Sequence, residues 1–299
     1  MVDAGSTDGT MDRALETSKG RQNFKIIVDS TATNPARGRN VGAKVSTGSL
    51  LGFIDADCIA ERTWLSTLVD QFGTQKVAGV GGRTVFGNVP NGRPLLQGLH
   101  GALETKLGNG GSLLFDRTMH PKRVKHLPSC NAVYLKEVFF LVGGFDGSLR
   151  YCEDVCLNQS IRRAGFYLYY TPNATVIHSY RESVSEFVSW MYNYGKGRST
   201  IVRRRRSTLS APMVAILATF SVTITLAEVS PVSFIQIFLL SLAAYLALGA
   251  LLGIISTRKI GYRSFLYAPS YLIIHLVYAT GTLAGLLPRK EWRKRSDAR

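Results

Sequence analysis

The chain has 299 residues, and its 36 lysines and arginines against 20 aspartates and glutamates give a formal net charge of +16. Hydrophobic residues make up 45% of the chain and charged residues 19%, below the roughly 25% of an ordinary soluble domain. A chain this apolar can bury a core, which excludes intrinsic disorder, and four cysteines are too few for a disulfide-stapled mini-protein. Low charge content with a large positive excess indicates either a membrane-embedded part or a surface for polyanions.

Residues 1–207 show alternating strand and helix patterns. Short apolar runs bounded by glycine or acidic residues predict strands, and the run at 50–54 ends abruptly in Asp-Ala-Asp. Apolar residues at helical spacing predict helices. The alternation predicts an α/β domain with a mostly parallel sheet, whose ligands bind beyond the carboxyl ends of the strands. The predicted strands are 25–28, 50–54, 77–80, 84–86, 167–170 and 174–177, and the predicted helices are 63–72, 133–142 and 155–164.

Two carboxylates, Asp55 and Asp57, directly follow the predicted strand 50–54. Carboxylates one residue apart on a turn can converge on a hard divalent cation such as Mg²⁺ or Mn²⁺, which prefers oxygen ligands and is often shared with phosphates. The pair could instead be a solvated turn or a helix cap. Other polar residues near predicted strand ends favour the metal interpretation: Asp3, Arg37, Arg39, Asn40, Glu153, Asp154 and His178.

Several of these residues also have a purely structural interpretation. Glu153 and Asp154 could simply occupy the start of the helix at 155–164, where acidic side chains are favourable. His178 could be a strand-end histidine without a ligand role. Arg39 could be a surface charge instead of a contact to phosphate or nucleobase.

Two further groups are interpreted as structural. Cys152 and Cys156 lie four residues apart, but a metal site needs more ligands than two thiols, so we expect reduced thiols. His120 and His126 fall in a long loop that begins near residue 109, and we expect both rings to be exposed to solvent.

Charged residues almost disappear between positions 208 and 288, where Glu228, Arg258, Lys259 and Arg263 alone interrupt the apolar sequence. The three apolar runs, 209–227, 232–255 and 265–287, each approach or exceed the roughly 20 residues that a helix needs to span a bilayer. A buried hairpin of a soluble protein is the alternative, but successive runs of this length are typical of membrane proteins.

Basic residues set the predicted topology. Four arginines at 203–206 precede the first run and should stay cytoplasmic, where they can contact membrane lipids with anionic heads. The tail after residue 288 is also basic, so we expect the third run not to cross fully. The sequence thus predicts a multi-pass cell-membrane protein with a cytosolic domain at 1–207, two to three apolar helices within 208–288 and a basic tail at 289–299. Because the basic residues cluster beside apolar runs, we expect no nucleic-acid partner.

Five segments, in this order, resemble family 2 glycosyltransferases of the GT-A fold. They are VDAGSTDGT, ARGRNVGAKVSTGSLLGFIDAD, CNAVYLKEVFFLVGGFD, YCEDVCLNQSIRRAGF and TPNATVIH, and the resemblance covers nearly all of residues 1–207. Each segment alone is a weak signal, but five in series at compatible spacing are specific. The stretch YNYGKGR at 192–198, followed by arginines and apolar runs, resembles the membrane-bound branch that builds exopolysaccharides, of the succinoglycan-synthesis type.

The resemblance implies an enzyme that moves a sugar from a nucleotide-diphospho-sugar to a lipid-linked or polysaccharide acceptor, with inversion and with Mg²⁺ or Mn²⁺. The domain would be Rossmann-like, catalytic and cytoplasmic. Asp154, with Glu153 beside it, would be the general base. The implied metal ligands are Asp55, Asp57 and His178, and the implied substrate-binding residues are Asp3 near the nucleobase, Arg37, Arg39, Asn40, Asp55 at the ribose and Arg198 at the departing diphosphate.

The sequence departs from the family pattern in two places. The family opens with a strand, a helix and a second strand, whereas this chain starts at the end of that second strand, so about 30 or more residues are missing. Either the complete protein carries them and is active, which the intact acid and metal residues favour, or the nucleotide pocket is impaired and the chain is a catalytically degenerate membrane scaffold of a polysaccharide assembly complex. Tyr-Gly-Lys-Gly-Arg at 194–198 stands where processive synthases carry Gln-x-x-Arg-Trp, which favours transfer of a single sugar.

Overall fold

The computed structural model describes residues 1–73, 76–87, 92–110, 112, 120–179, 181–205, 218, 222, 225, 228, 230–257 and 265–287. The chain forms two compact units. The first unit comprises residues 1–87 and 112–179, and the second comprises residues 88–111 and 180–299. The sequence predicted one boundary after residue 207, but the described residues of 92–110 and 181–205 group with the apolar helices instead.

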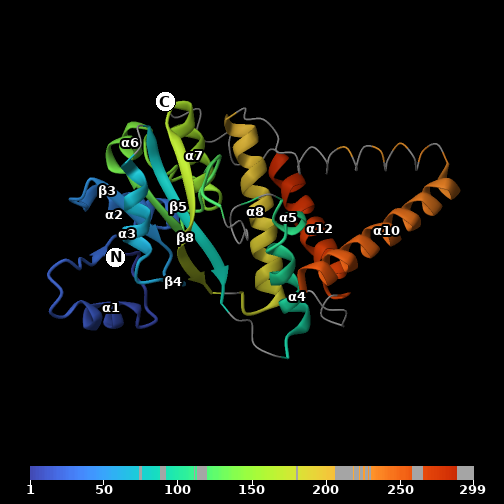
Figure 1. Cartoon of the computed structure of the whole chain (residues 1–299), viewed down its shortest axis with the longest axis horizontal. Coiled ribbons are helices and arrows are strands. Elements are labelled where there is room, and N and C mark those ends of the chain that lie inside the picture. The colour runs from blue at the N-terminus through green and yellow to red at the C-terminus, as the bar shows by residue number, and fades with distance from the viewer. Residues whose placement is uncertain are drawn as a thin grey trace. The chain divides into compact units, whose positions relative to one another are not determined.

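The first unit is built on a mixed sheet (Figure 1). Its strands β5 and β8 are parallel, and its other pairs are antiparallel. The predicted α/β fold is confirmed, whereas among the described strands the pairing is mixed rather than mostly parallel. The strand order is β3 (Leu50–Ile54), β7 (Asn131–Leu135), β5 (Val77–Phe86), β8 (Tyr167–His178) and β4 (Cys58–Ala60), with β6 (Lys122–Val124) also on β8, while β1 (Val2–Asp3) and β2 (Ile27–Val28) form a separate parallel pair.

The helices of the first unit begin where the sequence supplies starting signals. Asn34 caps α2, because its side chain accepts a hydrogen bond from the Arg37 backbone N–H, and a proline occupies the first turn. Acidic residues occupy the first turn of α7, as predicted. The helices are α1 (Thr10–Ser18), α2 (Pro35–Val45), α3 (Trp64–Val69) with a 3-10 turn at Asp70–Gly73, α6 (Lys136–Leu141) and α7 (Glu153–Arg163).

Three predictions of local structure are wrong. The predicted strand pairs 77–80 with 84–86, and 167–170 with 174–177, are single strands, β5 and β8. Glycines do not end β5, because they permit close approach of the partner strand: a Cβ atom on Gly82 would lie 1.9 Å from the Ala174 carbonyl oxygen. The predicted helix 133–142 begins as strand β7, whose pairing with β3 and β5 overrides its helical spacing, and continues as α6.

An aromatic cluster forms the main core of the first unit. The Phe53 ring lies 5.1 Å from the Phe145 ring and 5.6 Å from the Phe139 ring, centroid to centroid, and 6.1 Å from the Tyr134 ring. The Phe53–Phe145 pair is edge-to-face, and aromatic contacts of this kind add to the stabilisation from the apolar area that each ring buries. This core anchors the end of β3 just before Asp55.

The second unit is helical in its described residues and contains two candidate membrane spans, Phe234–Ser256 and Tyr267–Leu286, with mean hydropathy 2.4 and 1.2. They confirm the helical character of the second and third apolar runs. Of the first run, 209–227, only positions 218, 222 and 225 lie among the described residues. The helices are α4 (Pro94–Leu103), α5 (Lys106–Asn109), α8 (Val184–Arg205), α10 (Pro231–Thr257) and α12 (Tyr267–Leu286).

Small residues bring α8 and α12 into close contact. A Cβ atom on Gly281 would lie 2.1 Å from the Tyr192 carbonyl oxygen, and one on Gly285 would lie 2.1 Å from the Ser199 hydroxyl oxygen. Close backbone approach at small residues is the usual way in which apolar helices associate. This packing explains why α8 groups with the apolar helices.

Candidate active site

The register of two strands brings Asp57 next to His178. Strand β4 pairs antiparallel with β8 so that Cys58 lies opposite His178, and the Ser179 N–H donates to the Asp57 carbonyl at 2.8 Å. The His178 Nε2 atom lies 3.8 Å from Asp57 Oδ1. Ligand atoms of Asp55, Asp57 and His178 all lie within 4.8 Å of one another. The three residues that the sequence proposed as metal ligands therefore meet at one end of the sheet.

The imidazole of His178 is oriented by the backbone. Its Nδ1 atom lies 2.8 Å from the Ser179 carbonyl oxygen, which can only accept, so Nδ1 carries a proton and Nε2 is the ring nitrogen that can offer a lone pair to a metal. A backbone bond on the other ring nitrogen is typical of metal-ligating histidines. Two carboxylates and one neutral imidazole fit Mg²⁺ or Mn²⁺ by donor chemistry.

Arg39 joins Asp55 to Glu153. Its Nη2 atom lies 2.5 Å from Asp55 Oδ1 and its Nη1 atom lies 2.5 Å from Glu153 Oε1, and its side chain is only 15% exposed. Burial alone would lower the pKa of Arg39, but the Asp55 and Glu153 carboxylates outweigh burial and raise it. The guanidinium thus stays charged and ties α2, the end of β3 and the start of α7 together.

Glu153 holds its proton unusually strongly. Burial, followed by the negative charge of Asp154, raises the pKa of Glu153 to about 7, although Arg39 opposes this shift. Its side chain is 9% exposed. Near neutral pH the residue therefore exists in both protonation states.

Asp154 lies between a backbone donor and a histidine. Its Oδ2 atom accepts from the Ser129 N–H at 3.4 Å and lies 3.6 Å from His126 Nε2. Its Oδ1 atom accepts from the Val155 N–H at 2.7 Å, so Asp154 also serves the first turn of α7. Its side chain is 17% exposed, so the carboxylate remains partly accessible.

His126 was predicted to be exposed to solvent and was not among the predicted site residues. The ring is 22% exposed, and its Nδ1 atom lies 3.0 Å from the Asn158 amide nitrogen. That amide nitrogen also donates to the Leu127 carbonyl, so it is a donor to Nδ1, and Nε2 must carry the proton that faces Asp154. The contact spans the loop and α7, and no local pattern signals it.

The remaining predicted residues have other positions. Asn40 both donates to and accepts from the Phe145 backbone, and Arg37 Nε donates to the Gly147 carbonyl, so these two side chains hold the loop after α6. The Ser6 hydroxyl and the Ser6 and Gly5 N–H groups bond the Asp3 carboxylate and lower its pKa. Arg198 lies on α8 of the second unit, half-buried.

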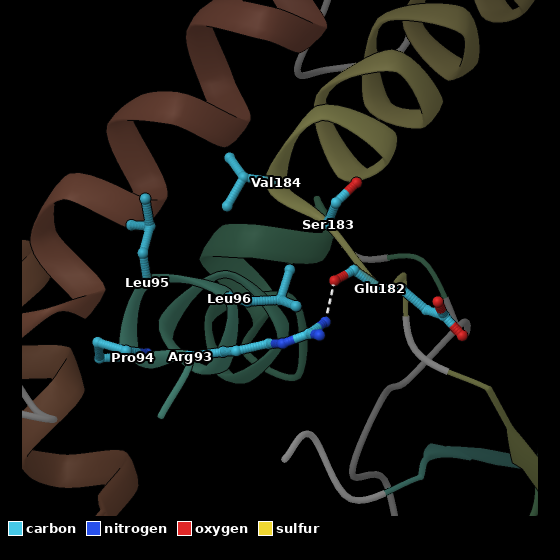
Figure 2. A pocket seen from close by; sticks show the side chains of 7 residues that line it. All are labelled: Arg93, Pro94, Leu95, Leu96, Glu182, Ser183 and Val184. Atoms are coloured by element: carbon cyan, nitrogen blue, oxygen red, sulfur yellow. Dashed lines mark hydrogen bonds between the residues drawn. The ribbon is translucent and has the colours of Figure 1, made fainter. Parts of the chain in front are cut away.

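One pocket of the second unit contains none of the predicted site residues (Figure 2). It lies at the starts of α4 and α8, and its walls are largely aliphatic. The Arg93 guanidinium donates to the Glu182 carbonyl at its edge. The predicted site residues of the first unit therefore lie outside this pocket.

Comparisons of the sequence with known proteins point to one family. Residues 1–140 match the model of glycosyl transferase family 2. The pre-mycofactocin glycosyltransferase of Mycobacterium tuberculosis is 31% identical over 194 residues, which cover 64% of this chain and 39% of that protein. Glycosyltransferase AglE of Haloferax volcanii is 26% identical over 202 residues, which cover 66% of this chain and 61% of that protein. This chain therefore spans less than two thirds of the length of either relative.

A comparison of structures agrees on the fold. The mannosyltransferase PcManGT from Pyrobaculum calidifontis, in complex with GDP-Man and Mn²⁺, superposes with a TM-score of 0.55. The match covers 94% of this chain and 76% of that one at 15% sequence identity, a level at which the likeness concerns the fold alone. Residues 1–140 are thus similar to glycosyl transferase family 2, and the mixed α/β sheet agrees with the GT-A fold.

Proposed function

We propose that this chain transfers a sugar from a nucleotide-diphospho-sugar to the hydroxyl of a lipid-linked or polysaccharide acceptor, with inversion and with a divalent cation. The observation that carries the proposal is the meeting of Asp55, Asp57 and His178, whose ligand atoms lie within 4.8 Å of one another. The names of the relatives support glycosyl transfer. The mannosyltransferase of similar fold was solved with GDP-Man and Mn²⁺, so these are the first ligands to test.

Asp55, Asp57 and His178 would hold Mg²⁺ or Mn²⁺ at the end of the sheet. Such a cation, when bound, supplies positive charge that stabilises a departing diphosphate. Arg39 would fix the Asp55 carboxylate, because its guanidinium is itself held by Glu153. Arg198 is the proposed further contact to the diphosphate, as the family resemblance implies.

Asp154 would act as the general base. Its carboxylate accepts the proton of the acceptor hydroxyl, and the resulting oxygen nucleophile attacks the anomeric carbon opposite the leaving diphosphate. One attack from that side inverts the anomeric centre. His126 supports this role because its Nε2–H faces Asp154 Oδ2 at 3.6 Å and holds the carboxylate in place.

The apolar helices suggest where the acceptor is. Among the described residues, two helices are long and apolar enough to cross a bilayer, which agrees with membrane association. An acceptor anchored in the bilayer would need a catalytic domain held at its surface. We therefore place the reaction at the cytoplasmic face of the cell membrane, with the arginines at 203–206 beside anionic lipids.

The test measures release of nucleoside diphosphate by the full chain in membranes, with GDP- and UDP-sugars, a lipid extract as acceptor, and Mg²⁺, Mn²⁺ or a chelator. We expect Asp154→Asn to reduce turnover by about 10²–10⁴-fold, the usual contribution of a general base. We expect Asp57→Ala to lose activity at low cation concentration and to recover part of it at high concentration. Asp12→Asn, at an exposed position on α1, is the matched control and should be unchanged.

Equal turnover of wild type and Asp57→Ala at every cation concentration would remove the proposed metal role. Full activity of Asp154→Asn would remove the proposed base. No turnover by the wild type with any donor would favour the membrane scaffold over the enzyme.

A further inference from the structure

A second set of potential metal ligands overlaps the first. The side chains of Cys58, Cys130 and His178 offer two sulfur atoms and one ring nitrogen that lie within 4.8 Å of one another. Cys58 is half-buried on β4 opposite His178, and Cys130, 4% exposed, directly precedes β7. Nothing in the proposed glycosyl transfer uses either thiol. No disulfide joins the four cysteines of the chain, all of which the structure describes.

We propose that Cys58, Cys130 and His178 form a binding site for Zn²⁺, with the Asp57 carboxylate as the fourth ligand. Tetrahedral Zn²⁺ with bonds of about 2.3 Å to sulfur and about 2.0–2.1 Å to nitrogen needs ligand atoms about 3.5–3.8 Å apart. Asp57 Oδ1 already lies 3.8 Å from His178 Nε2 and 4.0 Å from Cys58 Sγ. Side-chain movements of roughly 1 Å would complete the tetrahedron.

The surroundings of the cluster suit such a site. The bond between His178 Nδ1 and the Ser179 carbonyl directs the Nε2 lone pair toward the cluster, as in other zinc sites. Because Zn²⁺ binds the thiolate form of cysteine, each Zn–S bond formed from a thiol replaces an S–H bond and releases one proton to solvent, with no change of oxidation state.

The two ligand sets select different cations. Mg²⁺ and Mn²⁺ prefer the carboxylate oxygens of Asp55 and Asp57, whereas thiolates prefer Zn²⁺ and other thiophilic cations. His178 and Asp57 belong to both sets, so a bound Zn²⁺ excludes the harder cation. The site is thus a Zn²⁺-binding inhibitory site. Its metal binding can be measured whether or not the chain transfers sugar.

The test titrates the reduced, metal-free full chain with Cd²⁺ and follows the ultraviolet charge-transfer band of cadmium–thiolate bonds, with Zn²⁺ added afterwards as competitor. We expect the band in the wild type and its removal by Zn²⁺. Cys58→Ser and Cys130→Ser should each reduce the band. Each should also weaken metal binding by at least about 10–100-fold, the usual cost of losing a residue that only supports a metal ligand. Cys156→Ala, which removes a thiol from α7, should leave both unchanged.

A second control separates the two ligand sets. Asp55→Asn removes a ligand of the carboxylate set alone, so the cadmium band should persist in this variant. An unchanged band in Cys58→Ser would overturn the proposal. Because Cys58 is only half-buried, this variant still tests the site if Cys130→Ser does not fold. The proposal would also be overturned if cadmium bound without a thiolate band and Asp55→Asn abolished that binding. The carboxylates alone would then hold the metal.

Discussion

Arg39 shows how one buried side chain can organise a site. A guanidinium that is 15% exposed must be paired, and its two partners, Asp55 and Glu153, come from segments far apart in the sequence. Arginine suits this position because its planar fork can reach two carboxylates at once, whereas lysine presents a single charged point. The bridge fixes Asp55 beside Asp57 and fixes the start of α7, which carries Asp154.

Glu153 gives a prediction at the residue scale. Its pKa in the folded chain is about 7, above the ordinary value of 4.5, so between these pH values the folded state binds more protons than the unfolded state. Stability must then fall as the pH rises through this window, by up to about 3 kcal/mol from this group. We expect Glu153→Gln to flatten the dependence of the melting temperature on pH between 4.5 and 7, measured on the full chain in detergent.

Glu137→Gln is the matched control for this prediction, since Glu137 is an exposed glutamate in the first turn of α6. Its melting curve should keep the slope of the wild type. If the melting temperatures of wild type and Glu153→Gln change equally with pH, then the protonation of Glu153 does not affect the stability of the fold.

At the scale of elements, the sequence predicted what depends on local pattern. Strand β3 has the predicted bounds, and the predicted acidic start of α7 is confirmed, so Asp55, Asp57, Glu153 and Asp154 could be found from the sequence. The continuity of β5 and β8 could not be predicted, because whether a glycine ends a strand depends on the neighbouring strand. The contact of His126 with Asp154 is tertiary for the same reason, and so is the pairing of Cys58 with His178.

The close approach of β5 and β8 gives a prediction at this scale. A Cβ atom on Gly82 would lie 1.9 Å from the Ala174 carbonyl oxygen, so Gly82→Ala must push the strands apart. We expect a loss of stability of about 1–3 kcal/mol or more. Beyond Gly82, the pairing of β5 with β8 continues as far as His178. We therefore expect Gly82→Ala also to weaken Mn²⁺ binding, which calorimetry can measure.

Gly52→Ala on β3 is the control, because its added Cβ atom would meet its nearest neighbours, Trp64 and Val133, at 3.7 Å, an ordinary contact. This variant should melt within a few degrees of the wild type. Equal melting temperatures for Gly82→Ala and Gly52→Ala would contradict the close approach of β5 and β8.

At the scale of the whole molecule, hydropathy and tertiary contact give different divisions of the chain. The predicted cytosolic domain at 1–207 included the residues of α8, whereas the close contacts of α8 with Gly281 and Gly285 place it with α12. Of the candidate membrane span in α12, 33% is buried in the structure, against 11% of the span in α10. Helix α10 therefore presents more apolar surface to its surroundings. Hydropathy reports how apolar a segment is, but it does not report which segment packs on it.

This difference makes α10 the helix on which a membrane prediction can be tested. We expect the full chain to stay in the membrane fraction after washing with 1 M salt and then with alkaline carbonate. Salt at about 1 M shortens the Debye length to roughly 3 Å and would release a protein held by basic residues alone, whereas an inserted helix resists both washes. Leu240→Lys combined with Leu248→Lys, both exposed on α10, should cost about 2.5–3.5 kcal/mol per lysine near the bilayer centre and shift the chain into the carbonate extract. The same two positions changed to alanine should remain in the membrane, because alanine adds no charge to the span. Complete release of the wild type by salt would show that lipid-head contacts of basic residues, rather than α10, hold the chain at the membrane.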